Sequence, residues 1–164
     1  MKTKTIFEFD TLVANHSKEI YAYLWRMFHN RQDAEDAFQD TFLRAFRAYP
    51  RLLENSNQRA WLYKIATNVA YTHLKRRSRT LSRTTDLTVL LAADEKVPHD
   101  VLMEVLAAVE ALPEKQRAAL ILRNYQGLAY PEIGTALDCS PDSARANVYQ
   151  AIKKLRSQFK KEIP

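Results

Sequence analysis

The sequence predicts an all-α protein of two small helical domains joined by a flexible linker, the second of them a helix-turn-helix domain. No segment alternates apolar and polar residues as a half-buried strand does. The 164 residues include only 2 glycines, which leaves few tight hairpins. Helical periodicity is strong from Phe7 to about Lys75, fades, and resumes near Asp100.

The gap in periodicity divides the chain. We expect one lobe at 5–78, a linker at 79–99 and a second lobe at 100–162, and each lobe is large enough for three or four helices around a modest core. The linker is rich in Thr, Ser, Asp and Arg, which favours a flexible connection. Its segment Leu87–Ala93 is nevertheless apolar enough to pack against another surface.

Composition limits the class of protein. The net charge of +6 favours an anionic partner, although many basic proteins bind none. The single cysteine, Cys139, excludes an internal disulfide framework and fits a reducing cytosol; without a second Cys or a nearby His it also predicts no metal site. The start MKTKTIFEFD becomes acidic too early for a signal peptide, and no apolar run reaches membrane-spanning length. We expect a cytoplasmic protein without membrane insertion or cofactor.

The segment Asp33–Tyr49 predicts an amphipathic helix with an acidic ridge. Its apolar face carries six residues at helical spacing: Ala34, Phe38, Thr41, Phe42, Ala45 and Phe46. Asp33, Asp36 and Asp40 lie on the opposite face. Acids early in a helix suit the positive end of its dipole, so the ridge is either a solvated face or a docking surface for a basic protein.

The segment Gln58–Arg77 predicts a second amphipathic helix. Its apolar stripe consists of Trp61, Leu62, Ile65, Ala66, Val69 and His73. Its other face consists of Lys64, Thr67, Asn68, Tyr71 and Lys75. Cations can neutralise phosphates, amides can pair with base edges, and a phenol ring can stack on an exposed base. This face therefore suits nucleic acid, with a solubilising face that ends in a basic tail as the alternative.

The stretch Leu112–Arg156 predicts a helix-turn-helix. Pro113 suits the first turn of a helix, and Gly127 suits its left-handed end. Gly134 lies inside the next helix, where a close helix crossing would explain it. Ser140 can cap the third helix and Pro141 fits its first turn.

The third helix predicts one packed face and one reading face. Ala144, Val148, Ala151, Ile152 and Leu155 form the apolar stripe. The other side offers a guanidinium, a phenol, an amide and an ammonium, from Arg145, Tyr149, Gln150 and Lys153. Groove-reading helices make base contacts with such groups near their first turns. An ordinary helical bundle with a wet face is the alternative.

Four segments together resemble the extracytoplasmic-function (ECF) sigma factors of bacterial RNA polymerase. They are DAEDAFQDTFLRAFRAY (33–49), RAWLYKIATNVAYTHLKRR (59–77), LPEKQRAALILRNYQGLAYPEIGTALDCS (112–140) and the helix that follows. The resemblance extends over both lobes, and agreement in order and spacing is far more specific than a lone helix-turn-helix.

The resemblance implies three sets of site residues. The first lobe is the counterpart of sigma region 2 and docks on the polymerase core through Asp33, Asp36, Gln39 and Asp40. A second set of residues in the same lobe is implied to open the −10 element and read it as single strand. These residues are Asn57, Lys64, Asn68, Tyr71, Lys75, Arg76 and Arg77. The second lobe is the counterpart of sigma region 4 and reads the −35 element as duplex through Arg123, Ser143, Arg145, Asn147, Tyr149, Gln150, Lys153 and Lys154.

The same resemblance implies partners and no covalent chemistry. The partners are core RNA polymerase, through its β and β′ subunits, promoter DNA and an anti-sigma factor. Departures from the family pattern fall in the helix-turn-helix: Ala129 stands where a capping Ser is frequent, and Asn147 replaces a frequent Arg. Asp142 would repel phosphate unless it accepts from a cytosine amine. A divergent −35 preference is the expected consequence.

Two other functions compete with this interpretation. An autonomous helix-turn-helix regulator would bind duplex tightly without polymerase, while its first lobe senses a ligand or dimerises. A nuclease would need a catalytic cluster. The four His are scattered, and Asp33, Asp36 and Asp40 have no phosphate-cradling loop beside them.

Overall fold

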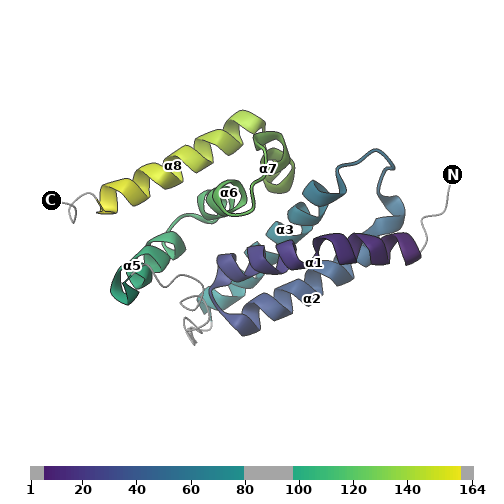
Figure 1. Ribbon diagram of the computed structural model, residues 1–164, viewed down its shortest axis with the longest axis horizontal. Coiled ribbons are helices and arrows are strands. Elements are labelled where there is room, and N and C mark those ends of the chain that lie inside the picture. The colour runs from purple at the N-terminus through teal and green to yellow at the C-terminus, as the bar shows by residue number, and fades with distance from the viewer. Residues whose placement is uncertain (1–5, 80–97, 160–164) are drawn as a thin grey trace.

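The computed structural model describes residues 6–79 and 98–159, and within them every regular element is a helix. Figure 1 shows their arrangement. In chain order they are α1 (Ile6–Phe28), α2 (Arg31–Ala48), the 3-10 turn η1 (Tyr49–Arg51), α3 (Gln58–Arg79), α5 (His99–Glu110), α6 (Glu114–Asn124), α7 (Tyr130–Leu137) and α8 (Pro141–Phe159). The predicted all-α class is confirmed. Most of the predicted linker, residues 80–97, lies outside the described residues.

The first lobe consists of α1, α2 and α3, which pack on one another. His29 takes a left-handed φ of 50° between α1 and α2, and the Asn30 side chain caps α2 by accepting a 2.9 Å bond from the Asp33 amide. On α2, Ala34 and Thr41 are buried as predicted. Phe46 was expected in the core but is 49% exposed, with one edge of its ring packed on Phe9 of α1 at a centroid distance of 5.3 Å.

The second lobe contains the predicted helix-turn-helix, α6 to α8. Gly127 has φ 70°, as expected of a residue that reverses the chain after α6. Asp138 takes φ 55° at the end of α7, and the Ser140 side chain accepts a 3.1 Å bond from the Ser143 amide at the start of α8. Gly134 is explained by a close approach, but not by a helix crossing: a Cβ there would meet the Cys139 carbonyl oxygen at 2.6 Å, within the turn itself.

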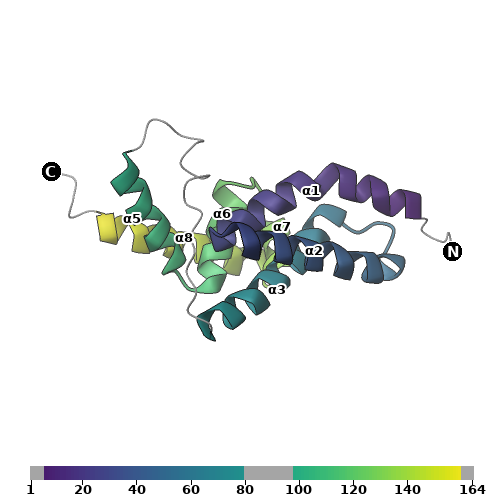
Figure 2. The same cartoon turned by 90° about the horizontal axis from the view of Figure 1, so that it is seen from below.

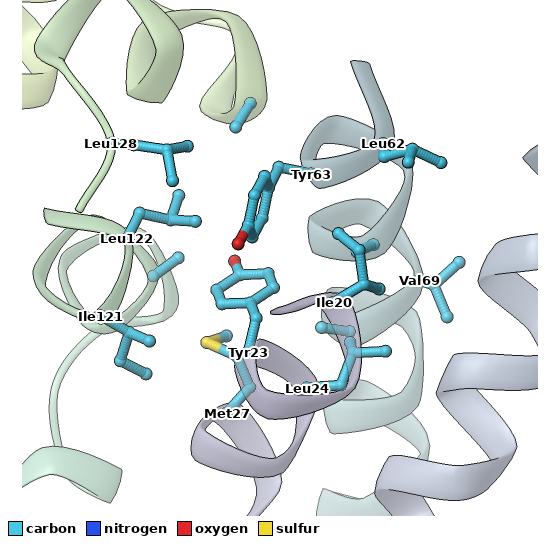
Figure 3. Close-up of a cluster of buried hydrophobic side chains, with 14 of the residues drawn as sticks. Ile20, Tyr23, Leu24, Met27, Leu62, Tyr63, Val69, Ile121, Leu122 and Leu128 are labelled. Carbon is cyan, nitrogen blue, oxygen red and sulfur yellow. The ribbon is translucent and has the colours of Figure 1, made fainter. Parts of the chain in front are cut away.

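The two lobes share one apolar cluster. It joins Tyr23 and Met27 of α1 and Tyr63 of α3 to Ile121 and Leu122 of α6. Figure 3 shows these helices meeting, with the Tyr23 and Tyr63 hydroxyls pointing toward one another. The sequence predicted a core in each lobe but not that the two would be continuous; a smaller separate cluster surrounds Leu112, Leu120 and Ala151. We name this packing of α6 and α7 against α1 and α3 the closed arrangement.

The closed arrangement places the start of the helix-turn-helix beside the first lobe. In both ribbon views α6 and α7 lie next to α1 and α3 (Figures 1 and 2). Helix α8 packs on α6 and α7 and turns its other side away from the first lobe. Within residues 6–79 and 98–159, none of the helices combines the length and the hydrophobicity that a membrane span requires.

Candidate polymerase- and nucleic-acid-binding surfaces

The predicted docking residues on α2 divide into two exposed and two partly covered side chains. Asp36 and Gln39 are exposed, and Asp36 accepts a 3.0 Å bond from Gln32. Asp40 pairs with Arg44 at 3.2 Å and with His73 of α3 at 3.5 Å. These two groups therefore differ in how readily a partner protein could reach them.

Asp33 also faces α3. Its carboxylate lies 3.7 Å from the Arg77 guanidinium, which in addition donates a 2.8 Å bond to the Phe28 carbonyl at the end of α1. Asp33 and Asp40 thus lie on the side of α2 opposite the apolar stripe, as predicted, but both also contact α3. Helical spacing identifies the side of α2 but not how closely α3 approaches it.

The predicted −10 face of α3 lies partly beneath the helix-turn-helix. Lys64 pairs with Asp138 at 4.0 Å, and together with Pro131, Gly134 and Cys139 it lines a shallow groove. Tyr71 packs against the shared cluster, and its buried hydroxyl has no hydrogen-bond partner among the described residues. Burial raises the Tyr71 pKa, with smaller contributions from Glu114 and Cys139. Asn68 is exposed.

The remaining predicted −10 residues lie at the two ends of α3. The Asn57 side chain caps the helix by accepting a 3.1 Å bond from the Ala60 amide, and its amide group donates to Glu132 of α7 at 3.3 Å. Lys75 and Arg76 are exposed near the other end. Arg77 is committed to Asp33 and to the end of α1, so the geometry does not support it as a freely available phosphate ligand.

Gln126 connects the lobes, a role that no sequence pattern indicated. Its amide nitrogen donates to the Tyr63 hydroxyl at 2.7 Å and to the Glu19 carbonyl at 2.9 Å. Its amide oxygen accepts a 2.6 Å bond from Arg26, and its backbone carbonyl accepts a 2.9 Å bond from Arg59. Burial raises the Tyr63 pKa to about 12, so the hydroxyl stays protonated at neutral pH.

Arg59 reinforces this junction. It pairs with Glu19 of α1 at 2.9 Å and lies 3.6 Å from Glu132 of α7. The pKa of Arg59 is raised. Desolvation is the largest single contribution and lowers this pKa, but the nearby carboxylates of Glu19 and Glu132 raise it by more. A basic side chain of the first lobe is thus held by acids from both lobes.

A second polar junction surrounds the end of α1. Buried Arg117 of α6 donates to the Met27 carbonyl at 3.2 Å and to the Glu110 carbonyl. His29 lies 3.3 Å from the Glu110 carboxylate, and that contact is the first cause of the lowered Glu110 pKa. Guanidinium groups satisfy carbonyls that a helix end leaves unpaired, so α6 contributes to the C-terminal cap of α1.

The outer face of α8 is open. Arg145, Tyr149, Gln150, Lys153 and Lys154 are exposed, with Tyr149 63% exposed, whereas Ala144, Val148 and Ala151 are buried as predicted. Ser143 is also exposed, but Asn147 is only partly so and donates to the Ser143 carbonyl at 3.0 Å. The predicted residues therefore share one accessible side, apart from Asn147, which is engaged along its own helix.

The start of α7 lies beside the reading face. Glu132 accepts a 3.2 Å bond from the Ala129 amide, so the helix keeps this half of a capping box although Ala129 cannot supply the other half. Arg123, at the end of α6, donates to the Leu128 carbonyl at 3.1 Å. Its guanidinium carbon lies 4.3 Å from the centroid of the Tyr130 ring.

Comparison with known proteins identifies both lobes. Residues 12–80 match the family described as Sigma-70 region 2, and residues 102–155 match Sigma-70, region 4. The chain is 31% identical over 158 residues to the RNA polymerase sigma-H factor of Pseudomonas aeruginosa, covering 87% of this chain and 81% of that protein. It is also 30% identical over 151 residues to the RNA polymerase sigma factor CarQ of Myxococcus xanthus, covering 90% and 87%.

The ECF RNA polymerase sigma factor SigE of Mycolicibacterium smegmatis is 31% identical over 159 residues. The match covers 93% of this chain but 62% of SigE. Among solved structures, the sigma factor RpoE of Bartonella quintana, in complex with the anti-sigma factor NepR, has a TM-score of 0.73 at 21% identity and covers 96% of this chain and 100% of that one. CnrH, in complex with the cytosolic domain of CnrY, has a TM-score of 0.71 at 24% identity, with 97% and 92% covered. At these identities the two structures establish a common fold.

Proposed function

The chain belongs to the ECF family of RNA polymerase sigma factors, which direct promoter-specific transcription initiation, and we propose that its two lobes divide the recognition of the promoter. In this proposal residues 5–78 dock on core polymerase and read the −10 element, and residues 100–162 read the −35 element. Residues 79–99 form the linker between these two lobes. The observation that carries it is the open face of α8, which offers five polar or basic side chains to a groove.

Helix α8 and the end of α6 read the −35 duplex. Arg145, Tyr149 and Gln150 lie near the first turns of α8, where groove-reading helices meet base edges. Lys153 and Lys154 lie farther along and suit phosphates. Ser143 and Arg123 complete this surface, while Asn147 contributes less because its amide is bonded to the Ser143 carbonyl.

Helix α3 opens the −10 element, and this step requires the two lobes to separate. The contacts of Lys64 with Asp138 and of Asn57 with Glu132 support this, because both side chains would have to leave α7 to reach DNA. Tyr71 would likewise have to leave the shared cluster before it could stack on a base. Asn68, Lys75 and Arg76 are exposed already, so they could make the first contacts.

Helix α2 docks on core polymerase. Asp36 and Gln39 are accessible in the closed arrangement, whereas Asp33 and Asp40 would have to exchange their partners on α3. Exposed carboxylates on a protein of net charge +6 do not suit contact with phosphate, which supports a basic protein surface on the β or β′ subunit as the partner.

The remaining features of the proposal follow from the family. Selecting a promoter requires binding and no covalent chemistry from this chain, so it acts as a subunit of the polymerase in the cytoplasm. The two solved relatives bound to an anti-sigma factor and to the cytosolic domain of CnrY support an anti-sigma partner here as well. Such a partner would stabilise the closed arrangement, in which α3 is covered.

In vitro transcription with core polymerase and a promoter library tests the function. We expect initiation from a subset of promoters that share one −35 and one −10 sequence. An autonomous regulator would instead bind specific duplex alone and support no initiation, and that result would refute the proposal.

Distance measurement tests the separation of the lobes. Spin labels at Arg47 of α2 and Gln158 of α8, both exposed, report on the two lobes in a Cys139→Ser background. We expect the distance distribution to lengthen when core polymerase and promoter DNA are added together. An unchanged distribution in a complex that initiates transcription would contradict the opening step.

A further inference from the structure

Tyr130 brings together two arginines from different helices. The guanidinium carbon of Arg123, on α6, lies 4.3 Å from the centroid of its ring, and that of Arg145, on α8, lies 4.9 Å away. Tyr130 itself is the first residue of α7. One aromatic ring thus links all three helices of the helix-turn-helix on the side where duplex recognition is proposed.

The geometry leaves the arginines able to bind. A guanidinium that lies over an aromatic ring uses its flat face, while its N–H donors point outward around the rim. Both arginines are exposed, and the Arg145 side chain has 65% of its surface accessible. Arg123 uses one nitrogen to donate to the Leu128 carbonyl at 3.1 Å, which leaves its other N–H groups for a further acceptor.

The ring also lowers the cost of ordering the arginines on DNA. A long side chain free in solvent loses rotamer freedom when it is fixed at an interface. Arg145 has one competing partner, Asp142, whose carboxylate lies 3.8 Å away and is 94% exposed. An ion pair this exposed is weak and salt-screened, so it cannot fix Arg145 alone. The Tyr130 ring supplies a second contact that does not consume N–H donors.

We propose that Tyr130 is a positioning residue for −35 recognition. It holds Arg145 toward the base edges in the major groove and Arg123 toward a phosphate of the flanking backbone. This inference rests on the proposed role of the second lobe and adds a residue outside the predicted site. The arginines differ in what they read: a bidentate guanidinium on a guanine specifies sequence, whereas a phosphate contact sets register and salt dependence.

Two substitutions at one position separate this role from packing, because part of Tyr130 also contacts the shared apolar cluster. Tyr130→Phe keeps the ring and removes the hydroxyl. Tyr130→Leu keeps an apolar side chain and removes the ring. The holoenzyme of each variant is assayed for initiation on promoters randomised over the −35 element, at several salt concentrations. Base preference is a ratio among promoters, so it does not depend on how much of a variant is folded.

We expect Tyr130→Phe to match the wild-type preference. We expect Tyr130→Leu to lower the preference at the base pair read by Arg145 by about two- to fivefold. Its affinity for promoter DNA should also depend less steeply on salt, by up to about one unit of log–log slope, if Arg123 loses its phosphate. A Tyr130→Leu variant with wild-type preference and salt dependence would overturn the inference, as would equal losses in both variants.

The Arg145→Ala variant distinguishes the positioning role of Tyr130 from the proposed reading role of α8. If it changes the −35 preference and Tyr130→Leu does not, the positioning role fails and the proposed function stands. If Arg145→Ala leaves the preference unchanged as well, the assignment of α8 as the reading helix fails together with the role of Tyr130.

Discussion

The amide nitrogen of Gln126 lies 2.7 Å from the hydroxyl oxygen of Tyr63 and donates a hydrogen bond to it across the boundary between the two lobes. Both side chains are buried. Arg26, Glu19 and Arg59 of the first lobe also bond to Gln126. A single residue at the break between α6 and α7 therefore joins the helix-turn-helix to α1 and α3.

Replacing Gln126 by Ala should weaken the closed arrangement. The change leaves the buried Tyr63 hydroxyl without its partner and removes the acceptor of the Arg26 bond, at a cost of about 1–3 kcal/mol in the free energy of unfolding. Chemical denaturation measures the loss, and labels on α2 and α8 measure the distance between lobes. Gln158→Ala, at an exposed position on α8, is the matched control and should change neither. A Gln126→Ala protein as stable and as compact as wild type would refute the connecting role.

Acid should weaken the junction at the end of α1. The Glu110 pKa is lowered in the folded protein, first by the contact with His29, against an ordinary value of 4.5. A carboxylate with a lowered folded-state pKa stabilises the fold above its unfolded-state pKa, and this contribution is lost as pH falls through the folded-state value. We therefore expect Glu110→Gln to be less stable than wild type at neutral pH, with the gap closing below about pH 4.5.

Denaturant titrations of both proteins from neutral to acidic pH check this expectation. Glu104→Gln, at an exposed position on the same helix, serves as the control for a change of net charge. A gap between wild type and Glu110→Gln that is constant with pH would show that the carboxylate charge does not contribute.

The sequence predicted local structure well because local chemistry determines it. Ser140 caps α8 and Gly127 takes a left-handed φ, since a hydroxyl acceptor and a missing Cβ act within a few residues. Periodicity also identified the buried stripe of α8. Periodicity could not identify partners in space. It therefore did not indicate Gln126, which bonds to Glu19 107 positions away, or Tyr130, which contacts arginines on two other helices.

The predicted sites also differ according to whether local pattern or distant contacts determine them. The outer face of α8 was correctly read as exposed, because one helix needs only one side for packing. The predicted face of α3 was read as open, but Lys64 lies 4.0 Å from Asp138 at the end of α7, and Tyr71 packs against the shared cluster. An isolated helix pattern contains no signal for a second domain that packs on its polar side.

Gly134→Ala should destabilise the turn of the helix-turn-helix. In an open helix interior this change would stabilise by about 1 kcal/mol. Here the new Cβ would meet the Cys139 carbonyl oxygen at 2.6 Å, and backbone cannot move aside cheaply. We expect a net loss of about 1–2 kcal/mol, measured by denaturation. Thr135→Ala, the exposed neighbour, should change stability by less than about 0.5 kcal/mol. A stabilised Gly134→Ala protein would show that the turn relaxes freely.

Asp36→Lys should weaken binding to core polymerase by about tenfold without altering promoter preference, because it places a like charge against a basic docking surface. Titration of a labelled sigma factor with core polymerase measures the affinity, and the promoter library measures the preference. Asp10→Lys makes the same change of net charge at an exposed site on α1. Equal effects of the two variants would mean that net charge, and not the α2 surface, controls the interaction.

Arg145→Ala and Lys153→Ala should have different effects on promoter binding: the first on base preference, the second on affinity for all sequences. Both side chains are exposed on the same face of α8, but Arg145 lies in its second turn and Lys153 two turns farther on. Losing a bidentate base contact should cost about 1–3 kcal/mol on the preferred promoters and relax preference at one −35 position. Losing a phosphate contact should weaken binding to all sequences alike and reduce the salt slope by about one. Holoenzyme binding to promoter variants at several salt concentrations distinguishes the two, and a uniform loss for Arg145→Ala would make it a phosphate ligand.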